Sequence, residues 1–408
     1  MADFNAQKLQ AKAKINSPLG LAWIGFNFWF DPKEYVYLCS DWPYPTGYRH
    51  GQIYNWHNVK RIPSQGVYVM ENTVSIKRVS DNAVIPAKSI DISLNWCNWC
   101  WSLSFEVGKK GLALIKPTIN PTTGIMPTEI EININGYIWR FYVERWNETR
   151  SFASDSFTVS GRGITAELDE PYALKQTYLN EEDTSAKQLA ENILANTGWT
   201  LDWQIEDWLI KANAFSLRDT PIRALARIAQ AQDAIMFGDM KEKVIHFMKR
   251  YKVKTWNLAG AVPDKSIPPS VMKTLSQQFI PQPVYNGVYV VGTSQHGVSA
   301  LVKKAGTNGE PLLEQITDDL FTDTIVVLER GKNALCMGNG PFYKTSIILP
   351  LFDIGLLRLG EIIEMEIDGQ ATKGIVSAVR VMAEREENGV LKTAQTVEVV
   401  RWQVPSSA

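Results

Sequence analysis

The string most suggestive of chemistry is a pair of cysteines among tryptophans at residues 96–101, WCNWCW. A Cys-x-x-Cys pair can form half of a zinc or iron–sulfur site, or a redox pair, because thiolates are soft anionic ligands. A complete site needs two more ligands, and only Cys39 and Cys336 could supply them as thiolates. In an extended strand Cys97 and Cys100 point to opposite faces, so chelation requires a turn. We expect buried structural cysteines, with a metal site on these four as the alternative.

Other catalytic constellations are absent from the sequence. No nucleophile elbow of the Gly-x-Ser-x-Gly type occurs, and the glycine pairs at residues 161–163 and 338–340 lack the rest of a phosphate-binding loop. The acidic residues contain no evident glycosidase pair, which needs carboxylates ~5–9.5 Å apart. The histidines are scattered without evident partners: His50, His57, His246 and His296. We therefore predict no catalytic residues, no cofactor-binding residues and no enzymatic activity.

Composition excludes several classes of protein. The 408 residues contain 42 Lys and Arg against 43 Asp and Glu, so the formal net charge of −1 argues against a strongly basic nucleic-acid binder. Hydrophobic residues make up 45% and charged residues 21%, as in folded globular proteins. No stretch reaches the ~18–20 apolar residues of a spanning helix, and we expect no membrane span.

The elements that would position any site change character along the chain. Residues 1–16 are typical of a short polar helix or a loose arm. Aromatic residues crowd residues 23–56 between Pro and Gly, which favours strands and loops whose rings fill a thin core, cover a protein interface or stack on sugars. Residues 89–96 and 129–143 alternate polar and apolar residues, as half-buried strands do.

Helical spacing begins after residue 181. Residues 183–185, Asp-Thr-Ser, offer N-cap oxygens for a first helix; Asp219 or Thr220 would cap a second, and Pro221 suits its first turn. A strand pair follows at residues 235–247, then a proline-rich stretch, and then further strands interrupted by a helix near residues 322–337.

The order of these parts is more informative than any single motif. It runs through FTVSGRGITAELD (157–169), AKQLA (186–190), TGW (197–199), TPIRALARIA (220–229), VIHF (244–247), LERGKNAL (328–335), LGE (359–361) and GIV (374–376). This series resembles the tail or baseplate hub family of tailed phages, the late-control-gene-D-like proteins, over roughly residues 85–405. The spike proteins of type VI secretion share that hub fold. In the family the first string usually reads Gly-Arg-Asp, where this chain has Gly163.

The resemblance implies an α+β, mostly β fold, in which two similar tube-type β-barrel domains flank an α+β middle domain. The predicted domains are an N-terminal arm and aromatic-rich β segment (1–84), a first β-barrel domain (85–180), an α+β middle domain (181–252), a Pro-rich linker (253–283), and a second β-barrel domain with an inserted helix (284–408).

The resemblance also implies a mechanical function. The expected protein is a homotrimeric, pseudo-sixfold baseplate hub that joins the tail tube or distal tail ring to a central spike or fibre protein. Its channel would pass the tape measure protein and then DNA without binding DNA specifically. It would be a virion component of the tail tip, assembled in the host cytoplasm.

Two other functions stay open at this stage. One is the base of a secretion-system spike with the same fold. The other is a carbohydrate-binding or glycan-cleaving protein that uses the Trp- and Tyr-rich N-terminal segment. Some hub relatives hold an iron–sulfur cluster on cysteines, so the resemblance keeps such a cluster as an alternative to the expected absence of a cofactor.

Overall fold

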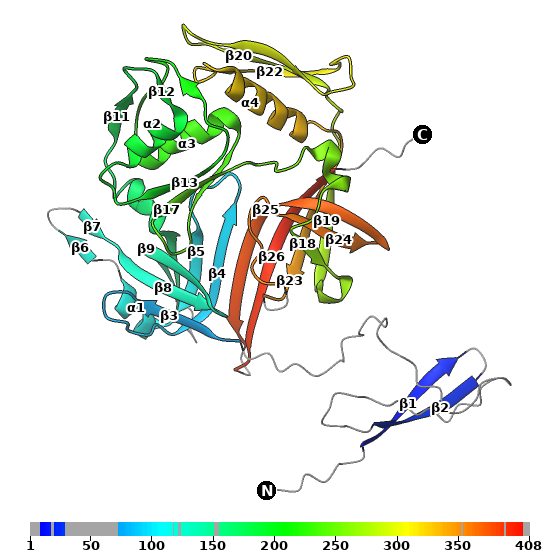
Figure 1. Ribbon diagram of the computed structural model, residues 1–408. Coiled ribbons are helices and arrows are strands. Elements are labelled where there is room, and N and C mark those ends of the chain that lie inside the picture. The colour runs from blue at the N-terminus through cyan, green and yellow to red at the C-terminus, as the bar shows by residue number, and fades with distance from the viewer. Residues whose placement is uncertain are drawn as a thin grey trace, which may run out of the picture. The chain divides into compact units, whose positions relative to one another are not determined.

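A computed structural model describes residues 9–17, 20–28, 72–116, 118–120, 124–150, 155–351, 354–386 and 389–402 (Figure 1). The chain divides into two compact units, Met1–Val69 and Met70–Ala408. In the first unit, β1 (Leu9–Ser17) and β2 (Gly20–Phe28) form an antiparallel hairpin. Strand β1 replaces the helix or loose arm expected there. The rest of the aromatic segment lies outside the described residues.

A twelve-stranded sheet organises the second unit. Its first half-sheet consists of β3 (Val74–Arg78), β4 (Ala87–Asn95), β5 (Ser102–Val107), β8 (Thr128–Ile134), β9 (Tyr137–Arg150) and β10 (Asp155–Gly163). Its second half-sheet consists of β18 (Lys265–Ile267), β19 (Thr274–Ile280), β23 (Phe342–Leu349), β24 (Ile362–Ile367), β25 (Gln370–Arg385) and β26 (Leu391–Trp402). The proline-rich stretch predicted as a linker therefore carries β18 and β19.

The two half-sheets are joined by one antiparallel ladder, between β4 and β25. The main path runs β19-β23-β26-β25-β4-β5-β10-β9-β8-β3, with β24 beside β25 and β18 beside β24. No closed barrel occurs in the part of the chain that the structure describes, so the two predicted barrels are found as one continuous sheet. The fold is mostly β with an α+β portion, as predicted.

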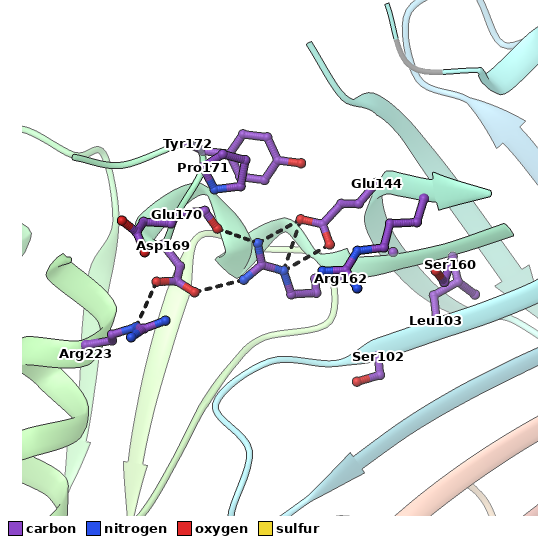
Figure 2. Close-up of a pocket in the computed structure, with 12 residues that line it drawn as sticks. Ser102, Leu103, Glu144, Ser160, Arg162, Asp169, Glu170, Pro171, Tyr172 and Arg223 are labelled. Carbon is purple, nitrogen blue, oxygen red and sulfur yellow. Dashed lines mark hydrogen bonds and ion pairs between the residues drawn. The ribbon is translucent and has the colours of Figure 1, made fainter. Parts of the chain in front are cut away.

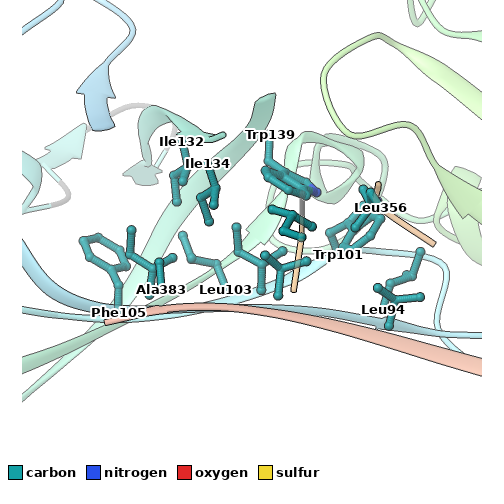
Figure 3. Packing of buried hydrophobic residues seen from close by; sticks show 14 of the residues in the cluster. Leu94, Trp101, Leu103, Phe105, Ile132, Ile134, Trp139, Leu356 and Ala383 are labelled. Atoms are coloured by element: carbon teal, nitrogen blue, oxygen red, sulfur yellow. The ribbon is translucent and has the colours of Figure 1, made fainter. Parts of the chain in front are cut away.

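Alternation along the strands builds the main core. Ile130, Ile132 and Ile134 on β8 are fully buried, while the residues between them are half-buried. Asn135 and Gly136 both have positive φ and form the predicted tight turn into β9. Figure 3 shows Ile132 and Ile134 in the cluster of buried side chains that also contains Trp101 and Trp139. The core is continuous across both half-sheets.

The α+β unit follows β10 and η1 (Ile164–Leu168). Helices α2 (Ala186–Leu194) and α3 (Pro221–Gln232) pack with a three-stranded sheet of β13 (Thr200–Gln204), β16 (Ile235–Gly238) and β17 (Val244–Met248). Two short pairs complete it: β11 (Gln176–Leu179) with β15 (Ser216–Asp219), and β12 (Thr184–Ser185) with β14 (Leu209–Ile210). Of the three candidate caps for α2, Ser185 is the N-cap, and its hydroxyl accepts from the Gln188 amide.

Smaller elements are inserted into the sheet halves. Between β5 and β8 the chain forms helix α1 (Lys109–Ile115) and then a hairpin of β6 (Thr118–Asn120) and β7 (Gly124–Met126). Between β19 and β23 the chain forms a three-stranded sheet and then helix α4 (Thr324–Met337). The sheet consists of β20 (Gly287–Gly292), β21 (Ser299–Lys303) and β22 (Leu312–Asp318). Turns η2 (Thr255–Gly260) and η3 (Pro269–Val271) precede β19. Among the described residues, none of the helices is long and apolar enough to cross a membrane.

We predict that Ile132→Asp or Val376→Asp abolishes folding of the second unit. Both side chains are fully buried in the core, one in each half-sheet. Burial of an unpaired carboxylate costs several kcal/mol, against a typical total stability of about 5–15 kcal/mol. Asn133→Asp is the matched control, because a carboxylate can still accept the hydrogen bond that Asn133 takes from the Gly136 amide. Circular dichroism during urea unfolding measures the effect, and native-like transitions in both core variants would contradict it.

Candidate functional site

A charged groove of about 610 Å3 lies where the first half-sheet meets the α+β unit. Strands β5, β9 and β10 line one side, and residues 169–172 with Arg223 of α3 line the other. Figure 2 shows the central side chain, Arg162 of β10, extending between Glu144 and Asp169. The groove therefore brings together residues from three strands, one loop and one helix.

The Arg162 guanidinium donates through all three of its nitrogens. Its Nε lies 3.0 Å from each carboxylate oxygen of Glu144, and its Nη2 lies 2.8 Å from Glu144 Oε1. Its Nη1 donates to Asp169 Oδ2 at 2.9 Å, and Nη2 also donates to the Glu170 carbonyl at 2.8 Å. Such charge-assisted, forked contacts are the strong kind of hydrogen bond and fix geometry as well as charge.

Asp169 carries the network on to helix α3. Its Oδ1 accepts from Thr220 Oγ1 at 2.9 Å and from Arg223 Nε at 3.2 Å. Its side chain is only 6% exposed. Burial opposes the charge, but the Thr220 hydroxyl, the Glu170 amide and the two arginines hold the pKa of Asp169 below its ordinary value. Asp169 is therefore a charged link between β10 and the first turn of α3.

A bulge in β9 makes this geometry possible. Val143 pairs with Gly161 and Arg145 pairs with Ser160, which leaves Glu144 as the extra residue. A side chain at Gly161 would place its Cβ 2.0 Å from the Tyr142 carbonyl oxygen, so only glycine fits opposite the bulge. Bulges re-aim side chains and increase the local twist of a strand. Here the bulge places Glu144 within reach of Arg162.

The WCNWCW string forms the turn between β4 and β5, and two of its tryptophan rings contact arginine side chains, one from β10 and one from the α+β unit. Arg162 lies over the Trp99 ring at 5.8 Å, and Arg250, which follows β17, lies over the Trp96 ring at 5.1 Å. The Trp99 carbonyl also accepts a hydrogen bond from the Gly238 amide at the end of β16. These tryptophans therefore form a docking platform for the α+β unit.

A second ionic junction extends from this platform. The Asp233 carboxylate, at the left-handed C-cap of α3, lies 3.0 Å from Arg250 and 3.4 Å from Arg330 of α4. Burial raises the pKa of Asp233, although both arginines act in the opposite direction. Asp233 thus connects α3, α4 and, through Arg250, the β4–β5 turn.

The cysteines occupy different environments. Cys100 and Cys336 are buried, whereas Cys97 is exposed in the β4–β5 turn, so the expected burial is confirmed for Cys100 and is wrong for Cys97; Cys39 lies outside the described residues. Burial raises the pKa of Cys100 to about 12 and also raises the pKa of Cys336. Across the described ranges, no group of three or more His, Cys, Asp or Glu side chains could hold a metal ion.

The histidines do not gather at the groove. His50 and His57 lie outside the described residues, and His296 is exposed in the β20–β21 loop. His246 of β17 has Nδ1 at 2.8 Å from Asp202 and Nε2 at 3.5 Å from Asp239. Its hydrogen bond to Asp239 raises its pKa, with a further contribution from Asp202, while burial opposes both.

Sequence reasoning did not identify the groove residues Glu144, Arg162, Asp169 and Arg223. The string containing Arg162 was considered as an incomplete phosphate-binding loop and as part of the family resemblance, and Arg162 itself was given no role. A charged residue inside an alternating strand was the available signal, because such a residue needs a partner when it is half-buried. The partners themselves lie 18 and 7 residues away, and pattern alone does not pair them.

Comparisons with known proteins identify the fold. No family model and no curated protein matches the sequence. Among solved structures, the chain is similar to a tail protein from Neisseria meningitidis, with TM-score 0.58 and 13% identity over 81% of this chain and 97% of that one. It is also similar to the 43 kDa tail protein of prophage MuSo2 from Shewanella oneidensis, with TM-score 0.54 and 14% identity over 81% and 98% of the two chains.

A third similar structure is a prophage tail protein from Listeria monocytogenes, with TM-score 0.52 and 13% identity over 82% of this chain and 95% of that chain. At these identities the similarity shows the fold alone. The chain has a phage tail, baseplate-hub-like fold, as the resemblance of its sequence predicted.

We predict that Arg162→Met destabilises the second unit by about 3–5 kcal/mol, because it leaves the largely buried Glu144 carboxylate without its cation and leaves Asp169 with Arg223 alone. The matched control is Arg145→Met, on the same groove wall but exposed, which should change stability by no more than about 0.5 kcal/mol. Urea unfolding at pH 7 measures both free energies. Equal stability of the two variants would show that the network contributes nothing.

Proposed function

We propose that this chain is the structural hub of a phage tail baseplate, in which three copies form a pseudo-sixfold ring. The observation that carries the proposal is the hub-like fold, shared with phage tail proteins over about four-fifths of the chain. In this proposal the ring joins the tail tube or distal tail ring to a central spike or fibre protein. The two half-sheets act as two tube-type domains, so three chains supply six.

The sheet supports ring formation because it is continuous and open. Strands β19 and β3 end its main path, and each has a single strand partner among the described residues. Unpaired strand edges readily accept a further strand. A head-to-tail contact between two different edges repeats around an axis and closes into a ring when the rotation allows. The sheet that forms the core can therefore also supply the contacts between copies in the ring.

The composition of one sheet face supports a channel for the tape measure protein and DNA. Alternate positions of β4 and β5 place Ser89, Asp91, Ser93, Ser102, Ser104 and Glu106 opposite the buried core positions. Asp91 is neutralised across the half-sheet junction by Arg380, whose Nε lies 2.8 Å away. A surface of hydroxyls and paired charges lacks the excess of cations that holds a nucleic acid. DNA would pass without specific binding.

The function proposed here is mechanical, and the described groove agrees with that. Its carboxylates and the Arg162 guanidinium are engaged with each other and fasten the α+β unit to the sheet. We place the protein in the virion at the tail tip, assembled in the host cytoplasm, with no catalytic step of its own.

We predict three-fold rings with a channel when the purified chain is concentrated. Electron microscopy with class averages tests this directly, and analytical ultracentrifugation gives the mass of the assembly. Rings should show a six-lobed rim, because each chain contributes two half-sheets. Rings of another symmetry, or monomers at every concentration, would contradict the proposed self-assembly.

We further propose that the cysteines hold no iron–sulfur cluster or zinc. Protein purified without oxygen should contain less than about one-tenth of an equivalent of iron or zinc, because Cys100 is a buried thiol whose raised pKa disfavours the thiolate that metals bind. Elemental analysis measures this. Stoichiometric iron with visible absorption, lost in Cys97→Ser, would refute it.

A further inference from the structure

The two half-sheets repeat one arrangement of strands. In the first, β8, β9, β10, β5 and β4 are neighbours in that order, and in the second β24, β25, β26, β23 and β19 follow the same order. The long strands β9 and β25 are equivalent in this repeat, as are β4 and β19. The sequence contains no short repeat that indicates this correspondence. The correspondence is therefore derived from the pairing of the strands.

A bulge aligns the two repeats residue by residue. Glu144 is the extra residue in β9, and Ser377 is the extra residue in β25. The cross-strand rows beside these bulges are Val143–Gly161–Leu103–Ile92 in the first half-sheet and Val376–Val399–Thr345–Gln277 in the second. Counting from these rows, Leu94 corresponds to Phe279, and Val379 corresponds to Trp146.

The β4–β25 ladder is the contact between successive repeats. Before its bulge, β25 pairs with β24 from Gln370 to Ile375, and after it the same edge pairs with β4 from Ala378 to Glu384. Strand β9 begins in the same way, since it pairs with β8 from Tyr137 to Val143. Beyond Val143 its outer edge has no ladder in the described part of the chain. Strand β19, the equivalent of β4, pairs only with β23 there.

The exposed side chains on these edges have buried equivalents at the occupied junction. Leu94 and Val379 lie directly opposite each other and are 2% and 1% exposed. Phe279, the equivalent of Leu94, is 48% exposed on β19. Trp146, the equivalent of Val379, is half-buried beyond the end of the β8 ladder. At the β4–β25 junction these two positions hold a buried aliphatic pair. On the unpaired edges of β19 and β9 the equivalent positions each hold an aromatic residue.

We propose that β19 of one copy pairs antiparallel with the second half of β9 of another copy, which repeats the β4–β25 ladder between subunits. In this register Phe279 lies opposite the partner subunit's Trp146, and Gln278 lies opposite the partner subunit's Asn147. The occupant of the β19 edge is therefore a second copy of this chain. The inference rests on the proposed ring and specifies how it closes.

The neighbouring side chains suit such a contact. Phe279 and Tyr343 have ring centroids 5.2 Å apart, and the Arg401 guanidinium lies 4.5 Å from the Tyr343 centroid. The partner subunit's Trp146 would extend this row of rings by one member. Aromatic pairs across antiparallel strands contribute more than their buried area alone. The pair on the opposite face, Asn147 and Gln278, is polar and exposed in the single copy.

The contact is head-to-tail, which distinguishes it from two symmetric alternatives. Two β19 edges could pair with each other around a twofold axis and would give dimers. The β19 edge could also meet β3, the other end of the main path. Neither alternative repeats a junction found within the chain, and both place a different residue opposite Gln278.

Crosslinking of single-cysteine variants separates these arrangements. Asn147→Cys and Gln278→Cys are prepared separately as full chains on a Cys97→Ser background, which removes the thiol that is exposed among the described residues. A bis-maleimide about 8 Å long fits, because directly opposed Cβ atoms in a sheet lie about 4.5–5.5 Å apart. We expect covalent dimers only when the two variants are mixed and reassembled, and covalent trimers from the double variant. The background protein alone controls for Cys39 and the buried thiols.

Matched controls test the register. Ser75→Cys on β3, mixed with Gln278→Cys, should give no product. Phe279→Lys should raise the concentration needed for half-assembly by at least about tenfold, whereas Leu174→Lys, a change at a loop residue that is 82% exposed, should leave it within about twofold.

Each failure has a separate meaning. Rings that crosslink through Ser75, or through Gln278→Cys alone, or through neither pair, would overturn the proposed register and leave the ring intact. Monomers at every concentration would overturn the ring and this inference with it.

Discussion

The antiparallel ladder between β4 and β25 is the constraint on which the rest of the second unit depends. It joins residues that are far apart in the chain, as the Asp91–Arg380 pair at a separation of 289 positions shows. Every other ladder of the sheet joins two strands of the same half. At the Ser377 bulge one edge of β25 changes its partner, from β24 before the bulge to β4 after it. The Ser377 carbonyl accepts a hydrogen bond from the Trp96 amide at the end of the β4–β25 ladder. A continuous core across both halves follows from that switch.

The inserted units are fastened to this sheet by charge and aromatic rings at one turn. Arg162 and Arg250 each lie over a tryptophan of the β4–β5 turn, and each binds a carboxylate at one end of α3. Asp169 meets the first turn of α3 through Thr220 and Arg223, while Asp233 is its C-cap. The α+β unit is therefore held at both ends of one helix. The string that first suggested a metal site is instead where this unit docks.

Local features of the fold were predictable from the sequence, and long-range pairings were not. Period-two alternation located β8 and β9, the Asn135-Gly136 turn was recognised, and α2 begins directly after the run of candidate caps at residues 183–185, because each signal lies within a few residues. Strand β19 was taken as linker, since its exposed polar residues give no alternation. The Arg162 network was missed because its partners are selected by the bulge at Glu144, a three-dimensional feature of two paired strands.

The repeat within the sheet shows why sequence comparison of the two halves reveals so little. Equivalent positions hold unlike residues: Ile92 corresponds to Gln277, Leu103 to Thr345 and Gly161 to Val399. What is preserved is the hydrogen-bond register and the position of the bulge, which depend on the backbone and not on the side chain. Strand β4 is occupied on both edges and buries Ile90, Ile92 and Leu94, whereas β19, occupied on one edge, is mostly polar. A polar edge limits indiscriminate pairing of the free chain. An aromatic residue at one position of that edge then favours a partner that presents another ring in register, so selectivity and solubility are set by the same strand.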